Sequence, residues 1–166
     1  MEIYKLTPGD WEKFKEIRLD ALKNGSEAFG SSFEEKVGKS DEEWRKTLEK
    51  PTNYIYAAAE GENICGMVAA YQEEGEKVSH IAYIWGVYVK KEYRGKGISQ
   101  QVMQSLLNEL KTTGKIEKIN LNVSTKQLPA IKLYESLGFQ IAGTLHKEMK
   151  INGKFIDEYI MEKLFW

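Results

Sequence analysis

The sequence predicts an α+β domain with a mixed, mostly antiparallel central sheet of about seven strands, flanked by about four helices. Strand-like runs follow one another from Asn53 to Val89 with short polar gaps between them, which predicts an antiparallel meander. A strand, helix, strand unit then extends over residues 83–123, and such a unit joins parallel neighbours by a right-handed crossover. Asn152-Gly153 predicts a type I′ turn in a final hairpin.

Capping signals mark the first two helices. After a short strand at residues 2–6, the segment Thr7–Asp10 combines a cap, a proline in the first turn and an acid, and Asn24-Gly25 ends the helix. Ser40–Glu43 has the capping-box pattern and opens a second helix, which stops at Pro51.

The segment between these helices, residues 26–35, is expected to form a loop with two aromatic side chains. Phe29 and Phe33 either line a pocket or anchor the loop to the core, and we favour anchoring. Farther along, Gly86 interrupts the third strand of the meander. A glycine inside a strand indicates a bulge or a close approach of backbone, which would free backbone groups of Val87 and Val89.

The chain is organised around residues 87–99, where an apolar run ends, a basic glycine turn follows and a helix begins. The helix carries an apolar stripe formed by Ile98, Val102, Leu106 and Leu110. A helix start leaves N–H groups unpaired and carries partial positive charge, and glycines let a ligand approach those donors. Arg94 and Lys96 add full charges, so the turn suits a phosphate or pyrophosphate. The alternative is an ordinary turn with solvated basic residues.

Two common nucleotide-binding motifs do not fit this turn. A Walker loop needs an earlier glycine that is absent here, and a dinucleotide fingerprint needs a glycine where this chain has Gln100. The turn instead resembles the acyl-CoA signature of the GCN5-related N-acetyltransferases (GNAT), Arg/Gln-x-x-Gly-x-Gly/Ala after a strand. Here it reads Arg94-Gly95-Lys96-Gly97-Ile98-Ser99, with Ser99 in the place of the usual glycine or alanine.

A second segment strengthens the resemblance. A short helix expected at residues 130–137 ends in Leu133-Tyr134-Glu135-Ser136-Leu137-Gly138-Phe139, which is similar to the Tyr-x-x-x-Gly-Phe signature of the same family. Both signatures occur in the family's order, and the resemblance covers nearly the whole chain. It implies a sheet in which the parallel pair is splayed, so that the pantetheine arm of a cofactor lies against free backbone like an added strand.

The resemblance implies acetyl-CoA as co-substrate and assigns residues to it. The cofactor-binding residues are then Val87, Tyr88, Val89, Arg94, Gly95, Lys96, Gly97, Ile98, Ser99, Asn122, Gln127 and Ala130. Gln127 stands where the family usually has asparagine. Tyr134 is the implied general acid, since a phenol with a pKa of about 10 can protonate a departing thiolate. The general base is left unassigned, with Glu34, Glu35, His80 and Glu148 as alternatives.

Composition excludes several other classes of protein. The 166 residues carry a formal net charge of -1, which argues against a nucleic-acid or anionic-membrane partner. Cys65 is the only cysteine, and His80 and His146 lack ligand spacing, so neither a disulfide nor a metal is expected. Without an apolar signal or spanning segment, we expect a cytoplasmic protein with one domain at residues 1–166.

The leading hypothesis is an enzyme that moves an acetyl group from acetyl-CoA to a primary amine by direct attack in a ternary complex. A longer acyl group or a hydroxyl acceptor is a second alternative, and a non-catalytic CoA-binding sensor or interaction module is a third. The acceptor stays open among polyamine, aminoglycoside, amino acid and protein N-terminus. The acids Glu148, Asp157 and Glu158 of the terminal hairpin would attract a cationic amine. A homodimer is also open, because the apolar terminus at residues 164–166 needs a partner or a groove.

Overall fold

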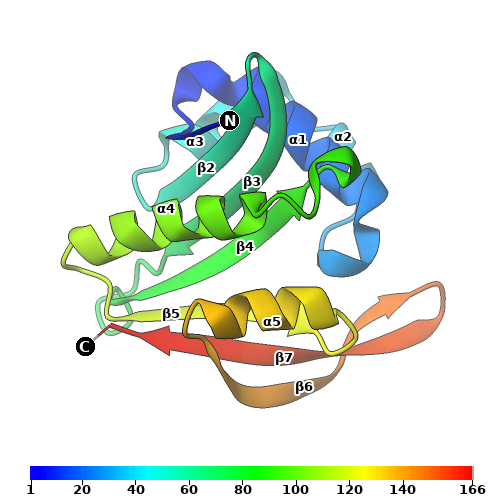
Figure 1. Cartoon of the computed structure of the whole chain (residues 1–166), viewed down its shortest axis with the longest axis vertical. Coiled ribbons are helices and arrows are strands. Elements are labelled where there is room, and N and C mark those ends of the chain that lie inside the picture. Colours follow the sequence, from blue (N-terminus) through cyan, green and yellow to red (C-terminus); the bar gives the residue numbers. More distant parts are fainter. Residues whose placement is uncertain (166) are drawn as a thin grey trace.

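The structure is a computed structural model that describes residues 1–165. The strands are β1 (Glu2–Lys5), β2 (Asn53–Glu60), β3 (Asn63–Gln72), β4 (Ile81–Val89), β5 (Lys118–Ser124), β6 (Gln140–Ile151) and β7 (Lys154–Leu164). The α-helices are α1 (Trp11–Asn24), α2 (Phe33–Val37), α3 (Asp41–Glu49), α4 (Ile98–Thr112) and α5 (Leu128–Ser136). The strands form one sheet in the order β1-β2-β3-β4-β5-β7-β6 (Figure 1). Only β4 and β5 pair in parallel among these strands, which confirms the predicted mixed sheet.

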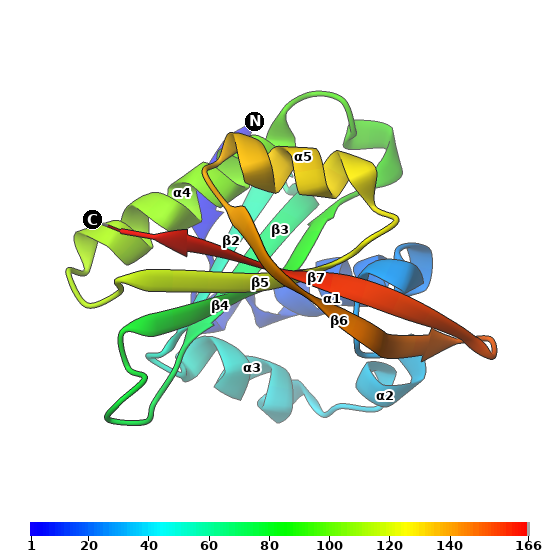
Figure 2. The same ribbon diagram turned by 90° about the horizontal axis from the view of Figure 1, so that it is seen from below.

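Helices cover both faces of the sheet. Figure 2 shows α4 and α5 on one side of the sheet and α1, α2 and α3 on the other. Val102 and Leu106 of α4 are fully buried in the core on the first side, together with Met161 of β7. Phe14 of α1 and Trp44 of α3 belong to the core on the second side. The helices α1, α3 and α4 therefore bury the apolar faces that their sequences predict, and the hydrophobic effect holds both layers to the sheet.

The parallel pair opens into a splay. β4 and β5 are paired only from Ile81 with Lys118 to Ile84 with Leu121. β4 then continues to Val89 and β5 to Ser124 without mutual pairing, and the two strands diverge in Figure 1. The splay that the family resemblance implied is thus present, and it leaves one edge of each strand free.

A bulge at Gly86 begins this divergence. On β3 and β4, Ala69 lies opposite Trp85 and Met67 lies opposite Tyr88, so β4 has one residue more than its partner between these pairs. Gly86 takes a φ of 68°, which side chains rarely adopt, and a Cβ there would lie 3.2 Å from Cε of Met67. The predicted bulge is confirmed, and it turns both Trp85 and Tyr88 toward α1.

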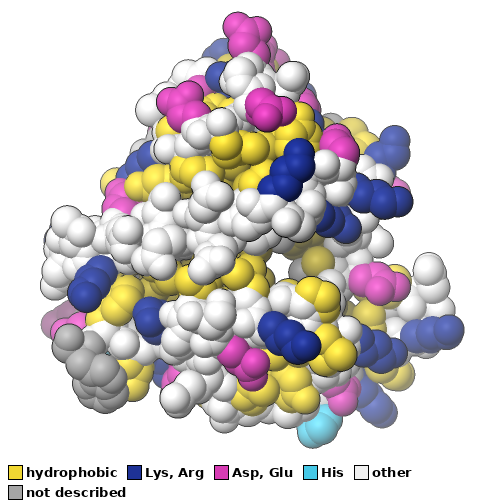
Figure 3. Space-filling model, viewed as in Figure 1, with side chains coloured by type: hydrophobic (Ala, Val, Ile, Leu, Met, Phe, Trp, Pro, Cys, Tyr) yellow, Lys and Arg dark blue, Asp and Glu magenta, His cyan; other side chains and the backbone are white. Residues whose placement is uncertain are grey.

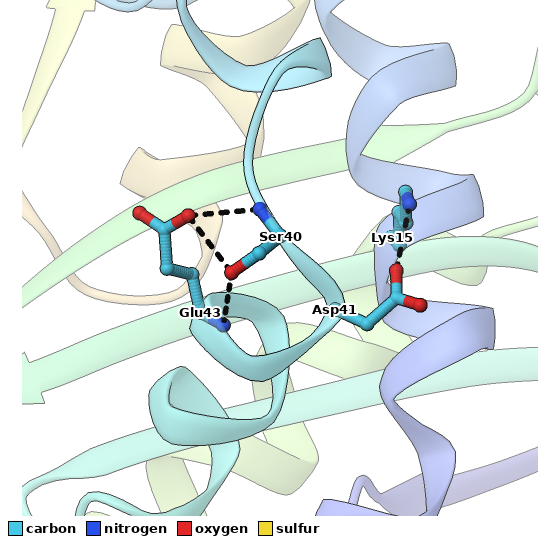
Figure 4. Close-up of polar contacts among 4 residues, drawn as sticks. All are labelled: Lys15, Ser40, Asp41 and Glu43. Atoms are coloured by element: carbon cyan, nitrogen blue, oxygen red, sulfur yellow. Dashed lines mark hydrogen bonds and ion pairs between the residues drawn. The ribbon is translucent and has the colours of Figure 1, made fainter.

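The capping box that the sequence predicts for α3 is present (Figure 4). Ser40 Oγ accepts a hydrogen bond from the Glu43 N–H at 3.3 Å, and the Glu43 carboxylate accepts one from the Ser40 N–H at 2.8 Å. Beside it, Lys15 of α1 donates to Asp41 at 3.1 Å. These contacts fix the start of α3 against α1 on the side of the sheet that contains Trp85.

The segment at residues 26–35 differs from the expected loop. It contains a 3₁₀ turn at Ser26–Ala28 and the start of α2, so the described chain has five α-helices where about four were predicted. Ser32 and Glu35 form a capping box of their own, the same Ser-x-x-Glu pattern that marks α3. Phe29 is buried and Phe33 packs against the same core, so both anchor the segment, and Phe29 also lines a cavity, so that both alternatives hold for this residue.

Two expectations from the sequence concern a membrane-spanning segment and the apolar C-terminal end. Among residues 1–165, no helix is both long and apolar enough to cross a bilayer. At the C-terminal end, Leu164 is exposed while Phe165 packs on the core next to α4 and α5. The third residue of the apolar terminus that raised the question of a dimer, Trp166, lies outside the described residues.

Candidate active site

A cavity of about 1740 Å³ occupies the splay between β4 and β5. It extends from the start of α4 and the face of α5 to α1 and the segment before α2. In Figure 3 the molecule is hollowed between its upper and lower halves, with hydrophobic side chains on the walls and lysines and arginines at the rim. The cavity therefore connects the side of the sheet covered by α4 and α5 with the side covered by α1.

The start of α4 lies beside this cavity. Gly97 is the cap of the helix with a φ of 74°, and Gly95 has a φ of 77°. The N–H of Gln101 donates to the Gly97 carbonyl at 3.1 Å, so the helical N–H groups before it have no acceptor within the helix. A Cβ at Gly95 would meet no atom within 4 Å, which leaves the turn open to a ligand. The geometry suits an anion.

The basic residues of this turn lie differently. Arg94 lines the cavity, and its Nε donates to the Val89 carbonyl at 3.0 Å while its guanidinium lies 5.8 Å from the centre of the Tyr88 ring. Lys96 is exposed, with its ammonium 5.1 Å from the centre of the Tyr93 ring. Ser99 is the other member of the Arg94–Ser99 signature on the cavity wall, whereas the four residues between them are outside the lining. Arg94 is thus held in place and Lys96 projects into solvent.

The free end of β4 is attached to α1. Tyr88 donates its hydroxyl hydrogen to Asp20 at 2.7 Å, and Lys90 pairs with Glu16 at 2.8 Å. Burial, together with the bond to Asp20, raises the pKa of Tyr88 to about 12. Val87, Tyr88 and Val89 all line the cavity, as the sequence analysis expects. Beyond Ile84 the edge of β4 that faces β5 has no ladder partner, so its backbone is available to a ligand.

The opposite wall comes from β5 and α5. Asn122, Gln127, Ala130 and Tyr134 line the cavity from this side. Gln127 precedes α5, and its N–H donates to the Ser124 carbonyl at 3.0 Å. The structure therefore brings the wall residues expected from β5 and α5 together with those from β4.

Tyr134 is 7% exposed and packs edge-on against Phe139, with 6.2 Å between ring centres. The Phe139 N–H donates to the Tyr134 carbonyl at 3.0 Å, which fixes the end of α5 to the chain that follows. Burial raises the pKa of the Tyr134 hydroxyl. The phenol consequently keeps its proton at neutral pH, as a proton donor must.

Arg18 is a cavity residue that the sequence analysis missed. It extends from α1, is 7% exposed, and lies between the rings of Phe29 and Trp85, 4.9 Å and 5.0 Å from their centres. Burial lowers its pKa to about 10. In the part of the chain that the structure describes, its buried Nη1 has no hydrogen-bond partner. An arginine between Ile17 and Leu19 in an amphipathic helix gives no sequence signal for such a position.

Acidic groups also face the cavity. Glu158 of β7 is 8% exposed and lines the wall together with Glu148 of β6. Burial, and the charge of Glu148, raise the pKa of Glu158 against the opposing effect of a hydrogen bond from Asn122. The other bases considered from sequence, Glu34, Glu35 and His80, are not among the lining residues.

Comparison with known proteins agrees with this geometry. The model of the Acetyltransferase (GNAT) family matches residues 11–139, which is most of the chain. The chain belongs to the GNAT family. This GNAT acetyltransferase is 27% identical over 127 residues to L-amino acid N-acetyltransferase AaaT of Escherichia coli K12. The aligned region covers 75% of this chain and 77% of that protein.

Solved structures repeat the fold of this GNAT chain. A GNAT-family acetyltransferase from Streptococcus pneumoniae superposes with a TM-score of 0.90 at 23% identity, covering 99% of both chains. The protein yncA of Salmonella typhimurium, solved with its cofactor acetyl-CoA, gives a TM-score of 0.84 at 17% identity over 99% of this chain and 93% of that one. These chains share one fold, and one protein with that fold is known with acetyl-CoA bound.

Proposed function

We propose that this GNAT enzyme transfers the acetyl group of acetyl-CoA to a primary amine of a small molecule, or of a protein or peptide, by direct attack in a ternary complex. The observation that carries the proposal is the single cavity through the splay, which joins the start of α4 to the side chains of α1. Two reactants that enter from opposite faces of the sheet would meet beside the bulge at Gly86. Such a meeting point is what direct transfer requires.

The residues on the α4 side suit the cofactor. N–H groups at the start of α4, with Arg94 beside them, would bind the pyrophosphate. The free edge of β4 at Val87 and Val89 would pair with the pantetheine arm, as an added strand does. Asn122, Gln127 and Ala130 would flank that arm from the other wall.

Acetyl-CoA supplies an acetyl thioester, and the chain supplies the groups around it. A backbone N–H of Val87 or Val89 would polarise the thioester carbonyl. The acceptor ammonium first loses a proton to water or to a carboxylate of the cavity. The neutral amine nitrogen then attacks the carbonyl carbon, a C–N bond forms, and the C–S bond breaks with its electron pair on sulfur. The sulfur then takes the proton of the Tyr134 hydroxyl, and the nitrogen releases a second proton to water or to a carboxylate of the cavity. Solvent restores the phenol, so protons and charge balance over one turnover.

Two glutamates that line the cavity, Glu148 and Glu158, suit the amine that reacts. Glu158, with Glu148 near it, would attract the ammonium form of the acceptor into the cavity. The proposal keeps the remaining expectations from the sequence, which are a cytoplasmic protein without a nucleic-acid or membrane partner. It also keeps the second candidate, a CoA-binding sensor, which differs only in having no turnover.

Thermal unfolding with acetyl-CoA, CoA and ATP tests the cofactor part of the proposal. A ligand at about 100 times its Kd stabilises the folded state by about 2.7 kcal/mol, and we expect that effect from acetyl-CoA and CoA but not from ATP. Release of free thiol that depends on an added amine then separates the enzyme from the sensor. If saturating intact acetyl-CoA leaves Tm unchanged, the assignment of residues 94–99 to the cofactor is wrong.

A further inference from the structure

Arg18 is a buried cation for which the described chain supplies no anion. Its guanidinium lines the cavity between Phe29 and Trp85, and the side chain is more than nine-tenths buried. None of the ion pairs among residues 1–165 includes Arg18. Its Nη1 is also left without any hydrogen-bond acceptor. The group therefore differs from an arginine that holds a core together by pairing.

Such an arrangement is unfavourable unless an anion completes it. A guanidinium carries five N–H donors and no acceptor, and burial of a charge without a partner costs free energy. The two aromatic rings stabilise the cation through their faces, but they do not accept hydrogen bonds from the donors in the plane of the guanidinium. A planar carboxylate matches those donors with two parallel hydrogen bonds. An anion that enters through the cavity would thus complete the site.

The position of Arg18 limits where that anion lies. Nη1 is 3.7 Å from the point that a Cβ on Gly86 would occupy, so the guanidinium lies against the bulge of β4. The proposed transfer takes place at this same bulge. An acceptor whose anionic group contacts Arg18 while its amine lies at the site of transfer must carry these two groups close together.

We propose that Arg18 binds the carboxylate of the acceptor, and that the acceptor is a small amino carboxylate of the α-amino acid type. This inference rests on the proposed function and names the substrate class of the same site. Arg18 then binds one end of the acceptor while Glu158 on β7 attracts the ammonium. A polyamine has only cationic groups, and Arg18 would repel it.

Matched substrates test the inference directly on the unmodified enzyme. L-methionine, L-leucine and L-phenylalanine are each compared with the amine that lacks only the carboxylate, and spermidine is added as a polyamine. We expect kcat/KM for at least one amino acid to exceed that of its matched amine by about 10- to 100-fold, the effect of a charge-assisted contact. Equal or faster turnover of all the matched amines would overturn the inference.

Arg18→Gln provides the second test, with Arg45→Gln as its control. Arg45 also lies over an aromatic ring, at 5.0 Å from the centre of Trp11, but it is outside the cavity lining. We expect Arg18→Gln to raise KM for the amino acid by about 10- to 100-fold without lowering turnover of the matched amine, which has no carboxylate for Arg18 to bind. Arg45→Gln should change neither. An unchanged KM in a folded Arg18→Gln protein contradicts the inference.

The same proteins separate this inference from the proposed function. A purely structural role for Arg18 predicts a lower Tm with both substrates affected alike, whereas the binding role predicts a selective loss for the amino acid. If acetyl-CoA raises Tm and amines without a carboxylate are acetylated while amino acids are not, only the role of Arg18 is wrong. If acetyl-CoA neither raises Tm nor is consumed with any amine, the proposed function fails and the inference fails with it. Arg18→Lys, which keeps charge without the planar pair of donors, replaces Arg18→Gln if the latter does not fold.

Discussion

Arg94 and Arg18 face one cavity in opposite settings. Arg94 is exposed, follows the end of β4, and is positioned by a hydrogen bond from its Nε to the Val89 carbonyl. Arg18 is buried on α1, between two aromatic rings, and has no partner for Nη1 among residues 1–165. Water solvates the first charge and not the second. An exposed arginine suits a phosphate that is itself partly solvated, whereas a buried one discriminates strongly, because an unpaired charge there is costly.

The two arginines also differ in how far sequence identifies them. Arg94 belongs to a motif in which the glycines at 95 and 97 are required by positive φ values and by the open approach to α4. A backbone with positive φ favours glycine, so this geometry can be recognised in the sequence. Arg18 depends on where α1 packs relative to Trp85 and Phe29, which no local pattern encodes. The half of the site that we propose for the cofactor is therefore readable from sequence, and the half that we propose for the acceptor is not.

The largest expected effect comes from Tyr134→Phe, which changes neither arginine. Loss of the proton donor should lower kcat by about 100-fold, the lower limit usual for general acid catalysis. KM for acetyl-CoA and for the acceptor should change little, because both binding sites stay intact. The measurement is kcat from pH 6 to 9 with free-thiol detection. Full activity at every pH, with the chemical step limiting the rate, would remove Tyr134 from the mechanism.

Arg94→Gln should have the next largest effect and should act on the cofactor alone. Loss of a charged contact to the pyrophosphate predicts a Kd for CoA about 10-fold higher, measured by calorimetry. Lys96→Gln is the matched control, because Lys96 is exposed and outside the cavity lining. Acceptor KM should be unchanged in both variants. Equal weakening by the two substitutions would mean that net charge, and not the position of Arg94, determines affinity.

The sequence predicted most of the fold because its local signals, such as helix caps and a glycine inside a strand, agreed with the strand pairing that the connection lengths require. The bulge at Gly86, the capping box at Ser40 and the parallel pair of β4 and β5 follow from single residues and from the length of a connection. The extent of the splay came from the family resemblance alone. The helix α2 was missed although Ser32 and Glu35 have the same capping pattern as α3. The helix after Ser32 has only five residues, which is too short for an apolar periodicity to show in the sequence.

The candidate site was less predictable than the fold. The expected residues of β4, β5 and α5 meet on one cavity, and Tyr134 is buried as an arbitrary core tyrosine also would be. Glu158 and Asp157 show the limit most clearly. Both are acids of one strand-forming segment, yet Glu158 is buried on the cavity wall and Asp157 is not. Their difference arises from which face of β7 is covered, and that depends on chain segments far away in sequence.

Ser40→Ala should have a smaller effect and should touch neither arginine. Loss of the cap on α3 predicts a free energy of unfolding lower by about 1 kcal/mol and a Tm lower by about 2–4 °C. The hydrogen bonds of the Ser40 hydroxyl are lost with it, whereas the Ser40 N–H, which contributes most to the lowered pKa of Glu43, still donates to that carboxylate. KM for either substrate should not change, since neither Ser40 nor Glu43 is among the residues that line the cavity. A change in acceptor KM would show that α3 positions α1, and that Arg18 responds to this packing.

The smallest expected effects come from Glu158→Gln and Asp157→Asn, which should shift stability in opposite directions with pH. Burial raises the pKa of Glu158, so the folded state keeps that proton to a higher pH than the unfolded chain does. Wild-type stability then falls as pH rises from the ordinary glutamate value through the raised one, and Glu158→Gln should gain Tm over the wild type across that window and hold the gain at neutral pH. Asp157 accepts hydrogen bonds from the Lys147 N–H and from His146, which lower its pKa.

Asp157→Asn should therefore lose Tm at neutral pH, with the loss shrinking as pH falls through the lowered pKa. Tm measured from pH 3 to 8 for the three proteins gives two difference curves of opposite sign. A Glu158→Gln curve that is flat, or that has the same sign as the Asp157→Asn curve, would mean that burial does not raise the pKa of Glu158 and that this wall of the cavity is solvated.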